Sequence, residues 1–167
     1  SADRTARVWD MRGGFATHNF RGHAGIVNMV QFHPDSARLL LVTGSEDCSA
    51  RVWSLHDKSC VATLGSHMSA VTSVAFTADG MTMATGSRDK VINFWELRRY
   101  SLMKTFPVYE EVEGLCISSS LAPSSPRAGR DGSNGQKKRK RPANGTSLDQ
   151  AQGYLVCVGS KGVARVW

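Results

Sequence analysis

Three residue types that together perform acyl-transfer chemistry occur close together in this chain, as His67, Ser73 and Asp89. A serine nucleophile, a histidine base and an aspartate that orients the base are the parts of a hydrolase triad. However, the histidine and the aspartate also occur one repeat earlier, as His23 and Asp47. A catalytic nucleophile would not be one position of a repeating template, so the repetition favours a structural role. The sequence also lacks a glycine-rich phosphate loop, a paired-carboxylate site and a cluster of metal ligands, so neither enzymatic function nor a cofactor is expected.

The repeating template is built around a tryptophan. It occurs four times, in residues 1–9, 45–53, 87–95 and 160–167. The tryptophans that end these segments follow one another at intervals of 44, 42 and 72 residues. If an insertion of about 30 residues interrupts the last interval, all three intervals agree with the roughly 40–45 residues of a four-stranded propeller blade.

Four short strand patterns fit within one repeat. In one repeat the expected strands are residues 70–76, 81–85, 91–95 and 101–106. In the preceding repeat they are residues 26–32, 39–43, 50–54 and 60–64. Short strands at even spacing, with no segment of helical periodicity, predict an all-β fold of radially arranged blades.

Particular residues of the repeat match a known family. Gly22-His23 and Ser66-His67 stand 30 and 28 residues before the tryptophans of their repeats, and Trp9-Asp10 is an intact WD dipeptide. In these features the chain resembles the WD-repeat β-propeller family. The resemblance implies two strands of one blade, two complete blades and three strands of a fourth. A closed ring in this family has seven blades, and both chain ends fall inside the repeat pattern, so they are interpreted as cuts through a longer protein.

The resemblance also implies a buried hydrogen-bonded network in each blade. It joins a histidine before the first strand, a serine or threonine on that strand, an aspartate in a tight turn and the tryptophan of the third strand. The corresponding residues here are His67, Ser73, Asp89 and Trp95. The preceding repeat offers His23, Asp47 and Trp53, but Met29 takes the serine position, so its network is expected to be incomplete. The last repeat lacks both the histidine and the turn aspartate, and apolar packing is expected to hold that blade together.

The segment from residue 118 to residue 152 differs sharply in composition from the rest. It is rich in serine, proline and glycine and has no large apolar residue between Leu121 and Leu148, which predicts disorder. It divides the chain into blades at residues 1–117, a basic insertion at 118–152 and the remainder of the fourth blade at 153–167. The five consecutive basic residues of the insertion are Lys137, Lys138, Arg139, Lys140 and Arg141. Such a run is interpreted as a nuclear-import signal or as a tether for RNA or an acidic partner. The remaining alternative is a solvated run of charges that no specific partner binds.

Charge and cysteine content limit the classes of partner. Of the formal net charge of +7, the insertion carries +5, so the remaining 14 basic and 12 acidic residues form no broad basic surface for phosphates. No stretch approaches the roughly 18 apolar residues of a membrane-spanning helix, and no small-molecule substrate is expected. The four cysteines lack the close pairs of a zinc site. They are expected to be buried reduced thiols, as in an intracellular protein.

Beyond the repeat template, several stretches are similar to one branch of the family. They include residues 17–22 (THNFRG), 30–35 (VQFHPD), 51–55 (RVWSL), 69–76 (SAVTSVAF), 86–90 (GSRDK) and 107–113 (PVYEEVE). These resemble the transducin β-like protein 3 family of small-subunit processome subunits. The resemblance implies a nucleolar scaffold of the U-three small nucleolar ribonucleoprotein that acts in pre-rRNA processing and ribosome biogenesis. Its partners would be other WD-repeat and processome proteins in a particle containing snoRNA and pre-rRNA, whether or not this chain contacts the RNA directly.

An alternative function is that of a substrate receptor of a cullin-type ubiquitin ligase. Trp9-Asp10-Met11-Arg12 fits the W-D-x-R pattern associated with such receptors. In either case, binding would use the propeller loops of one rim. The candidate contacts are Arg21, Gly22, Ala24 and Met68 before the first strands, and Glu46 and Arg88 in the turns between the second and third strands.

Overall fold

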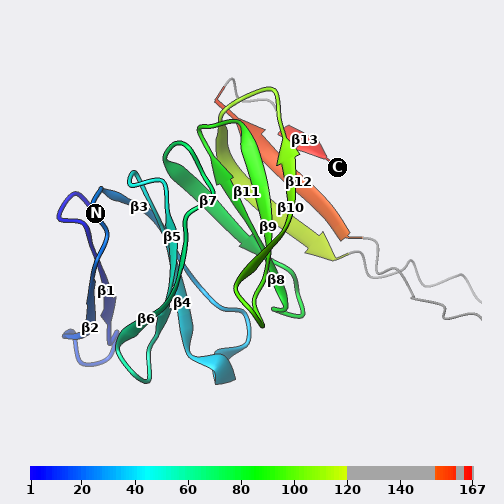
Figure 1. Ribbon diagram of the computed structural model, residues 1–167. Helices are drawn as coiled ribbons and strands as arrows, with labels where there is room; N and C mark the ends of the chain where they lie inside the picture. The colour runs from blue at the N-terminus through cyan, green and yellow to red at the C-terminus, as the bar shows by residue number, and fades with distance from the viewer. Residues whose placement is uncertain (120–152, 161–163, 167) are drawn as a thin grey trace, which may run out of the picture.

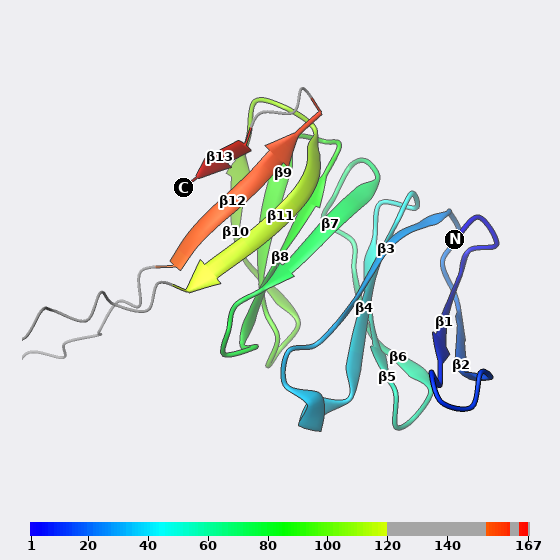
Figure 2. The same cartoon turned by 180° about the vertical axis from the view of Figure 1, so that it is seen from behind.

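The computed structural model describes residues 1–119, 153–160 and 164–166, which form four antiparallel sheets arranged like the blades of a fan (Figures 1 and 2). Blade 1 contains β1 (Thr5–Trp9) and β2 (Ala16–Arg21). Blade 2 contains β3 (Val27–Phe32), β4 (Leu40–Ser45), β5 (Ala50–Ser54) and β6 (Ser59–Leu64). Blade 3 contains β7 (Val71–Phe76), β8 (Thr82–Ser87), β9 (Val91–Glu96) and β10 (Ser101–Pro107). Blade 4 contains β11 (Val112–Ser119), β12 (Gly153–Gly159) and β13 (Ala164–Val166). The expected all-β propeller architecture is confirmed.

Each blade is a simple meander in which strands adjacent in the chain pair with one another. The first strands of the blades lie on the inner side of the fan, where β7 contacts both β3 and β11. The last strands, β6 and β10, lie at the outer edges of their sheets (Figure 1). Every residue of β10 is accordingly exposed, whereas five of the six residues of β7 are buried.

The apolar core lies between the blades. Leu41 and Trp53 of blade 2 pack against Ala6 and Phe20 of blade 1. The opposite face of blade 2 supplies a larger cluster with blade 3, whose buried members are Val42, Ala50, Val52, Leu64, Val71, Val74, Phe76, Met83, Trp95 and Leu97. Trp53 and Trp95 therefore each face the preceding blade, and burial of these side chains helps to hold neighbouring blades together.

The strands depart from the sequence expectation in small ways. A 3-10 turn at Ser36–Arg38, capped by the Asp35 carboxylate, precedes β4, so β4 begins one residue later than expected and runs two residues further. Strand β11 extends to Ser119, two residues into the segment assigned to the insertion, because Ser118 and Ser119 pair with Tyr154 and Gly153. The rest of the insertion, with its predicted disorder, lies outside the described residues.

The turns between the third and fourth strands share one unusual backbone position. Gly14, Lys58 and Tyr100 each stand five residues after the tryptophan of their blade and adopt positive φ angles of 68°, 55° and 52°. A side chain with a Cβ atom is strained in this left-handed region, by about 1–2 kcal/mol. Blade 1 avoids the strain with a glycine, and blades 2 and 3 do not.

Replacing Lys58 with glycine is therefore expected to raise the free energy of unfolding by about 0.5–1 kcal/mol, the strain relief being partly offset by the flexibility that glycine gives the unfolded chain. Urea titration of the intact protein followed by tryptophan fluorescence measures this change. Lys58→Ala, which removes the same exposed side chain but keeps the Cβ atom, should leave the stability nearly unchanged. Equal effects of the two substitutions would contradict the assignment of strain.

Candidate functional site

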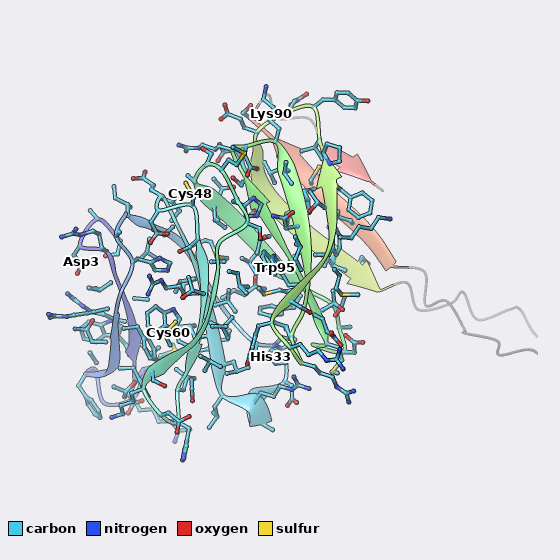
Figure 3. All side chains as sticks on the ribbon, in the orientation of Figure 1. Asp3, His33, Cys48, Cys60, Lys90 and Trp95 are labelled. Atoms are coloured by element: carbon cyan, nitrogen blue, oxygen red, sulfur yellow. The ribbon has the colours of Figure 1, made fainter. Side chains whose placement is uncertain are left out.

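A buried chain of hydrogen bonds crosses blade 3. The Nδ1 atom of His67 lies 2.9 Å from Oδ2 of Asp89, and its Nε2 atom lies 2.8 Å from Oγ1 of Thr85. The indole Nε1–H of Trp95 donates to the same Thr85 oxygen at 2.9 Å, and Figure 3 shows Trp95 inside the fan. The Asp89 carboxylate only accepts, so Nδ1–H of His67 donates to it; Nε2 then accepts from the Thr85 hydroxyl, whose oxygen accepts from the indole. Each of these polar atoms has a partner, which makes their burial tolerable.

The expected place of Ser73 in this network is wrong. Ser73 lies on β7 and is buried, but its Oγ atom has no hydrogen-bond partner among the described residues. The reason is the order of the strands, because β8 lies between β7 and β9 and carries Thr85 opposite Asn93. The indole of Trp95 on β9 therefore reaches a hydroxyl of the second strand and not of the first.

The network of blade 2 is complete, contrary to the expectation drawn from Met29. His23 lies 2.8 Å from Oδ2 of Asp47 and 2.7 Å from Oγ1 of Thr43, which accepts from the indole of Trp53 at 2.8 Å. The threonine is again on the second strand, so the residue at position 29 is irrelevant. The signal was present in the sequence, as Thr43-Gly44-Ser45 and Thr85-Gly86-Ser87 occupy the same place before the turn aspartates.

Burial and hydrogen bonding shift the protonation of the blade 2 pair. Burial lowers the pKa of His23 below its ordinary value, and the hydrogen bond and charge of Asp47 oppose this only in part. Burial alone would raise the pKa of Asp47, but hydrogen bonds from Ser49, His23 and the Ala24 N–H outweigh it and hold that pKa far below its usual range. At neutral pH the pair is thus a neutral imidazole that donates to a carboxylate.

Acidification from pH 7.5 to pH 5.5 is expected to lower the free energy of unfolding through His23. Below a pH of about 6.5 the unfolded histidine binds a proton that the folded one resists, so stability falls with pH in this window. The contribution of Asp47 is lost only near and below a pH of about 4. Urea titrations at several pH values measure the slope, and His23→Gln should make it shallower although the variant is less stable overall. An unchanged slope in His23→Gln would contradict this origin of the pH dependence.

The two networks hold loops at one end of the fan, which we call the histidine rim. It comprises residues 1–4, 21–26, 45–49, 65–70, 87–90 and 107–113. The Asp47 carboxylate accepts a hydrogen bond from the backbone N–H of Ala24, and Asp89 accepts one from that of Met68, each at 2.9 Å. The labelled Cys48 and Lys90 mark this rim in Figure 3, and His33 lies toward the other end.

The residues predicted as rim contacts all lie exposed on the histidine rim. They are Arg21, Gly22, Ala24, Glu46, Met68 and Arg88. Met68 is the most prominent, with 91% of its surface exposed. Arg88 lies 3.5 Å from the Glu113 carboxylate of blade 4, so it also bridges two blades. The structure therefore places this set on one surface, and its binding role stays a prediction.

The opposite rim carries the turns at residues 10–15, 33–39, 55–58, 77–81 and 97–100. The backbone N–H of Arg12 donates to Oδ1 of Asp10 at 2.9 Å, and the Arg12 side chain is exposed. Strand β11 ends and β12 begins on this side of the fan (Figures 1 and 2). The run from Lys137 to Arg141 lies outside the described residues, and its role stays a prediction.

The fourth blade uses Val108 at the position of the rim histidine. Val27, Val71 and Val112 are equivalent buried residues, and Val108 stands four residues before Val112 as His23 stands before Val27. Val112 and Cys157 pack with Ala84 and Ile92 of blade 3, and Val108 lies against this apolar cluster.

The expectation of four buried thiols is wrong for most of them. All four cysteines are free, but only Cys157 is buried, Cys48 is partly buried, and Cys60 and Cys116 are exposed. Cys60 lies on the outermost strand β6, where a strand-like pattern of residues does not imply burial on both faces.

Neither a metal centre nor a membrane helix is found in the part of the chain that the structure describes. Within residues 1–119, 153–160 and 164–166, no three metal-ligating side chains are grouped so that they could hold an ion. No helix within the same ranges is long and apolar enough to cross a bilayer.

Comparison with known proteins agrees with this geometry. The family model for the WD domain, G-beta repeat, matches residues 14–54 and 58–96. Transducin beta-like protein 3 of Rattus norvegicus is 41% identical over 165 residues, which are 99% of this chain and 18% of that protein. The Homo sapiens protein of the same name gives the same identity and coverage. Periodic tryptophan protein 2 of Arabidopsis thaliana is 35% identical over 99 residues, which are 59% of this chain and 11% of that protein.

The aligned part is therefore small relative to these relatives, since the chain spans 18% of the length of the two transducin beta-like proteins. It nevertheless covers 99% of this chain. Together with the repeating tryptophans and the four blades, these matches identify the chain as a WD-repeat protein related to transducin beta-like protein 3.

Proposed function

We propose that this chain is part of a nucleolar scaffold that holds proteins together in the small-subunit processome during pre-rRNA processing. The observation that carries the proposal is the 41% identity with transducin beta-like protein 3 over 99% of the chain. The resemblance drawn from the sequence associates that family with the U-three ribonucleoprotein. The coarser function, a WD-repeat scaffold for protein interactions, follows from the repeats and blades themselves.

Within the residues that the structure describes, the groups that resemble a catalytic triad serve the fold, which supports a scaffold role. The histidines and aspartates that resemble catalytic groups are engaged in the networks of blades 2 and 3, with His23 and His67 both only 7% exposed. Ser73, the serine of the triad-like set, is buried on β7 and has no hydrogen bond to either histidine. A nucleophile needs its base within hydrogen-bond reach, and Ser73 does not have one. The histidines and aspartates instead hold the loops of the histidine rim in place.

Purification of the intact protein from nuclear extract, with and without ribonuclease, tests the proposal by mass spectrometry. Recovery of processome subunits with precursor ribosomal RNA is the expected result. Recovery that survives ribonuclease would show that protein contacts are primary. Absence of ribosome-assembly factors from the purified material would refute the proposed function.

A ubiquitin-ligase receptor remains the second candidate because Arg12 is exposed on the opposite rim directly after the WD dipeptide. If Arg12 contacts a ligase adaptor, Arg12→Ala should abolish recovery of that adaptor and leave ribosomal RNA processing intact. If the scaffold proposal is correct, the same substitution leaves the set of recovered processome proteins unchanged. Arg98→Ala, on the same rim, is the matched control.

A further inference from the structure

The histidine rim combines fixed backbone positions with large exposed apolar side chains. The residue that follows the rim histidine occupies one slot of the template, taken by Ala24 in blade 2, Met68 in blade 3 and Tyr109 in blade 4. Met68 and Tyr109 are 91% and 79% exposed, although both side chains are largely apolar. Exposed apolar groups of this size at equivalent positions of adjacent blades are a feature of interaction surfaces.

The buried network determines where this slot lies. The Asp89 carboxylate binds both the Nδ1 atom of His67 and the backbone N–H of Met68, each at 2.9 Å. In blade 4 the backbone N–H of Val108, next to Tyr109, donates to the Lys90 carbonyl oxygen at 2.8 Å. The backbone beneath the exposed side chains is therefore ordered before any partner binds, which lowers the entropic cost of binding.

Charge distinguishes this rim from the opposite one. The segments of the histidine rim contain seven carboxylates, Asp3, Glu46, Asp47, Asp89, Glu110, Glu111 and Glu113, and four basic groups, Arg4, Arg21, Arg88 and Lys90. The turns of the opposite rim contain four carboxylates and five basic groups. Among its described residues the histidine rim is thus net negative, and three of the carboxylates, Glu110, Glu111 and Glu113, follow Tyr109 in its segment. This charge opposes the approach of phosphate groups and favours a positively charged partner.

We propose that the histidine rim binds a lysine- or arginine-rich protein segment that places an apolar side chain against Met68 and Tyr109. This inference rests on the proposed scaffold function and names the chemistry of one of its partners. The apolar contact supplies binding energy and the carboxylates select the basic segment over acidic segments and RNA.

Photo-crosslinking in the intact protein tests the proposal. Met68 is replaced by p-benzoylphenylalanine, the protein is irradiated in nuclear extract, and the crosslinked peptides are sequenced by mass spectrometry. The same replacement at Met11, which is 98% exposed on the opposite rim, is the matched control. The expected adduct at position 68 joins a peptide of net positive charge that position 11 does not capture. Its yield should fall when salt is raised, because ionic screening weakens the attraction.

A second variant tests the apolar part of the contact. The double variant Met68→Ser with Tyr109→Ser, which carries no crosslinker, should reduce recovery of the partner identified by the adduct about tenfold in affinity purification. This is the loss expected for one well-buried apolar contact. Met11→Ser should leave recovery unchanged. Adducts with RNA or with acidic peptides, or the absence of an adduct at position 68, would overturn the proposal. A basic adduct from a protein outside ribosome assembly would support this inference and refute the proposed function. Recovery of processome proteins without any adduct would support the proposed function and refute this inference.

Discussion

Replacing Thr85 with valine is expected to lower the free energy of unfolding by about 3 kcal/mol, although the side chain keeps nearly the same shape. The hydroxyl of Thr85 is fully buried and serves two partners, the Trp95 indole at 2.9 Å and Nε2 of His67 at 2.8 Å. Its removal leaves a buried donor and weakens a buried acceptor, each of which costs about 1–3 kcal/mol. The His67 ring keeps a longer contact of 3.3 Å with the Asn93 amide, so the loss at that atom is partial.

Ser73→Ala is the matched comparison and should have the opposite sign. The Ser73 hydroxyl is buried and finds no hydrogen-bond partner in the part of the chain that the structure describes, so its removal relieves a desolvation penalty and should raise stability by about 1 kcal/mol. Urea titration of both variants in the intact protein, followed by tryptophan fluorescence, measures the two changes. A larger loss for Ser73→Ala than for Thr85→Val would mean that the hydroxyl of the first strand, not of the second, completes the network.

The pair Ser73 and Thr85 also marks the limit of what the sequence could predict. The repeat of histidine, aspartate and tryptophan identified the blades and most of the network, because these residues recur at nearly constant spacing. The repeated Thr-Gly-Ser segments offered the second-strand hydroxyl as a candidate, but the choice between it and Ser73 depended on which strand lies beside β9, which is a property of the sheet. The same limit affected Cys60, whose exposure follows from the place of β6 at the outer edge.

The histidine rim was predicted as a set of loops, but its character was not. The repeat pattern indicated Met68 among several contacts but not Tyr109, because blade 4 lacks the histidine that would show the equivalence of Val108 with His23 and His67. The three buried valines that begin β3, β7 and β11 restore the alignment. With that alignment, Met68 and Tyr109 occupy equivalent positions of adjacent blades. The excess of carboxylates on the same rim then indicates a positively charged partner.

Adding a single methyl group at Gly86 is expected to cost about 3 kcal/mol, because this glycine lets two blades approach one another. A Cβ atom at Gly86 would lie 2.5 Å from Cγ1 of Val112 and 2.7 Å from Oγ of Ser73, and neither atom belongs to a flexible side chain. Gly44 occupies the equivalent place one blade earlier, with Val71 at 2.8 Å. Gly86→Ala must therefore push β11 away from β8, and overpacking of this kind costs about 1–3 kcal/mol or more.

Gly114→Ala on β11 is the control, since a Cβ atom there would meet nothing closer than 3.8 Å. It should change the midpoint of urea unfolding little, whereas Gly86→Ala should lower it markedly. The cause can be isolated with Val112→Ala, which removes the atom closest to the added methyl group. If crowding between blades is responsible, the double variant Gly86→Ala with Val112→Ala will be more stable than the sum of the single effects predicts. Strict additivity would instead place the cost of Gly86→Ala in the blade 3 sheet itself, because the contact with β11 would then carry none of it.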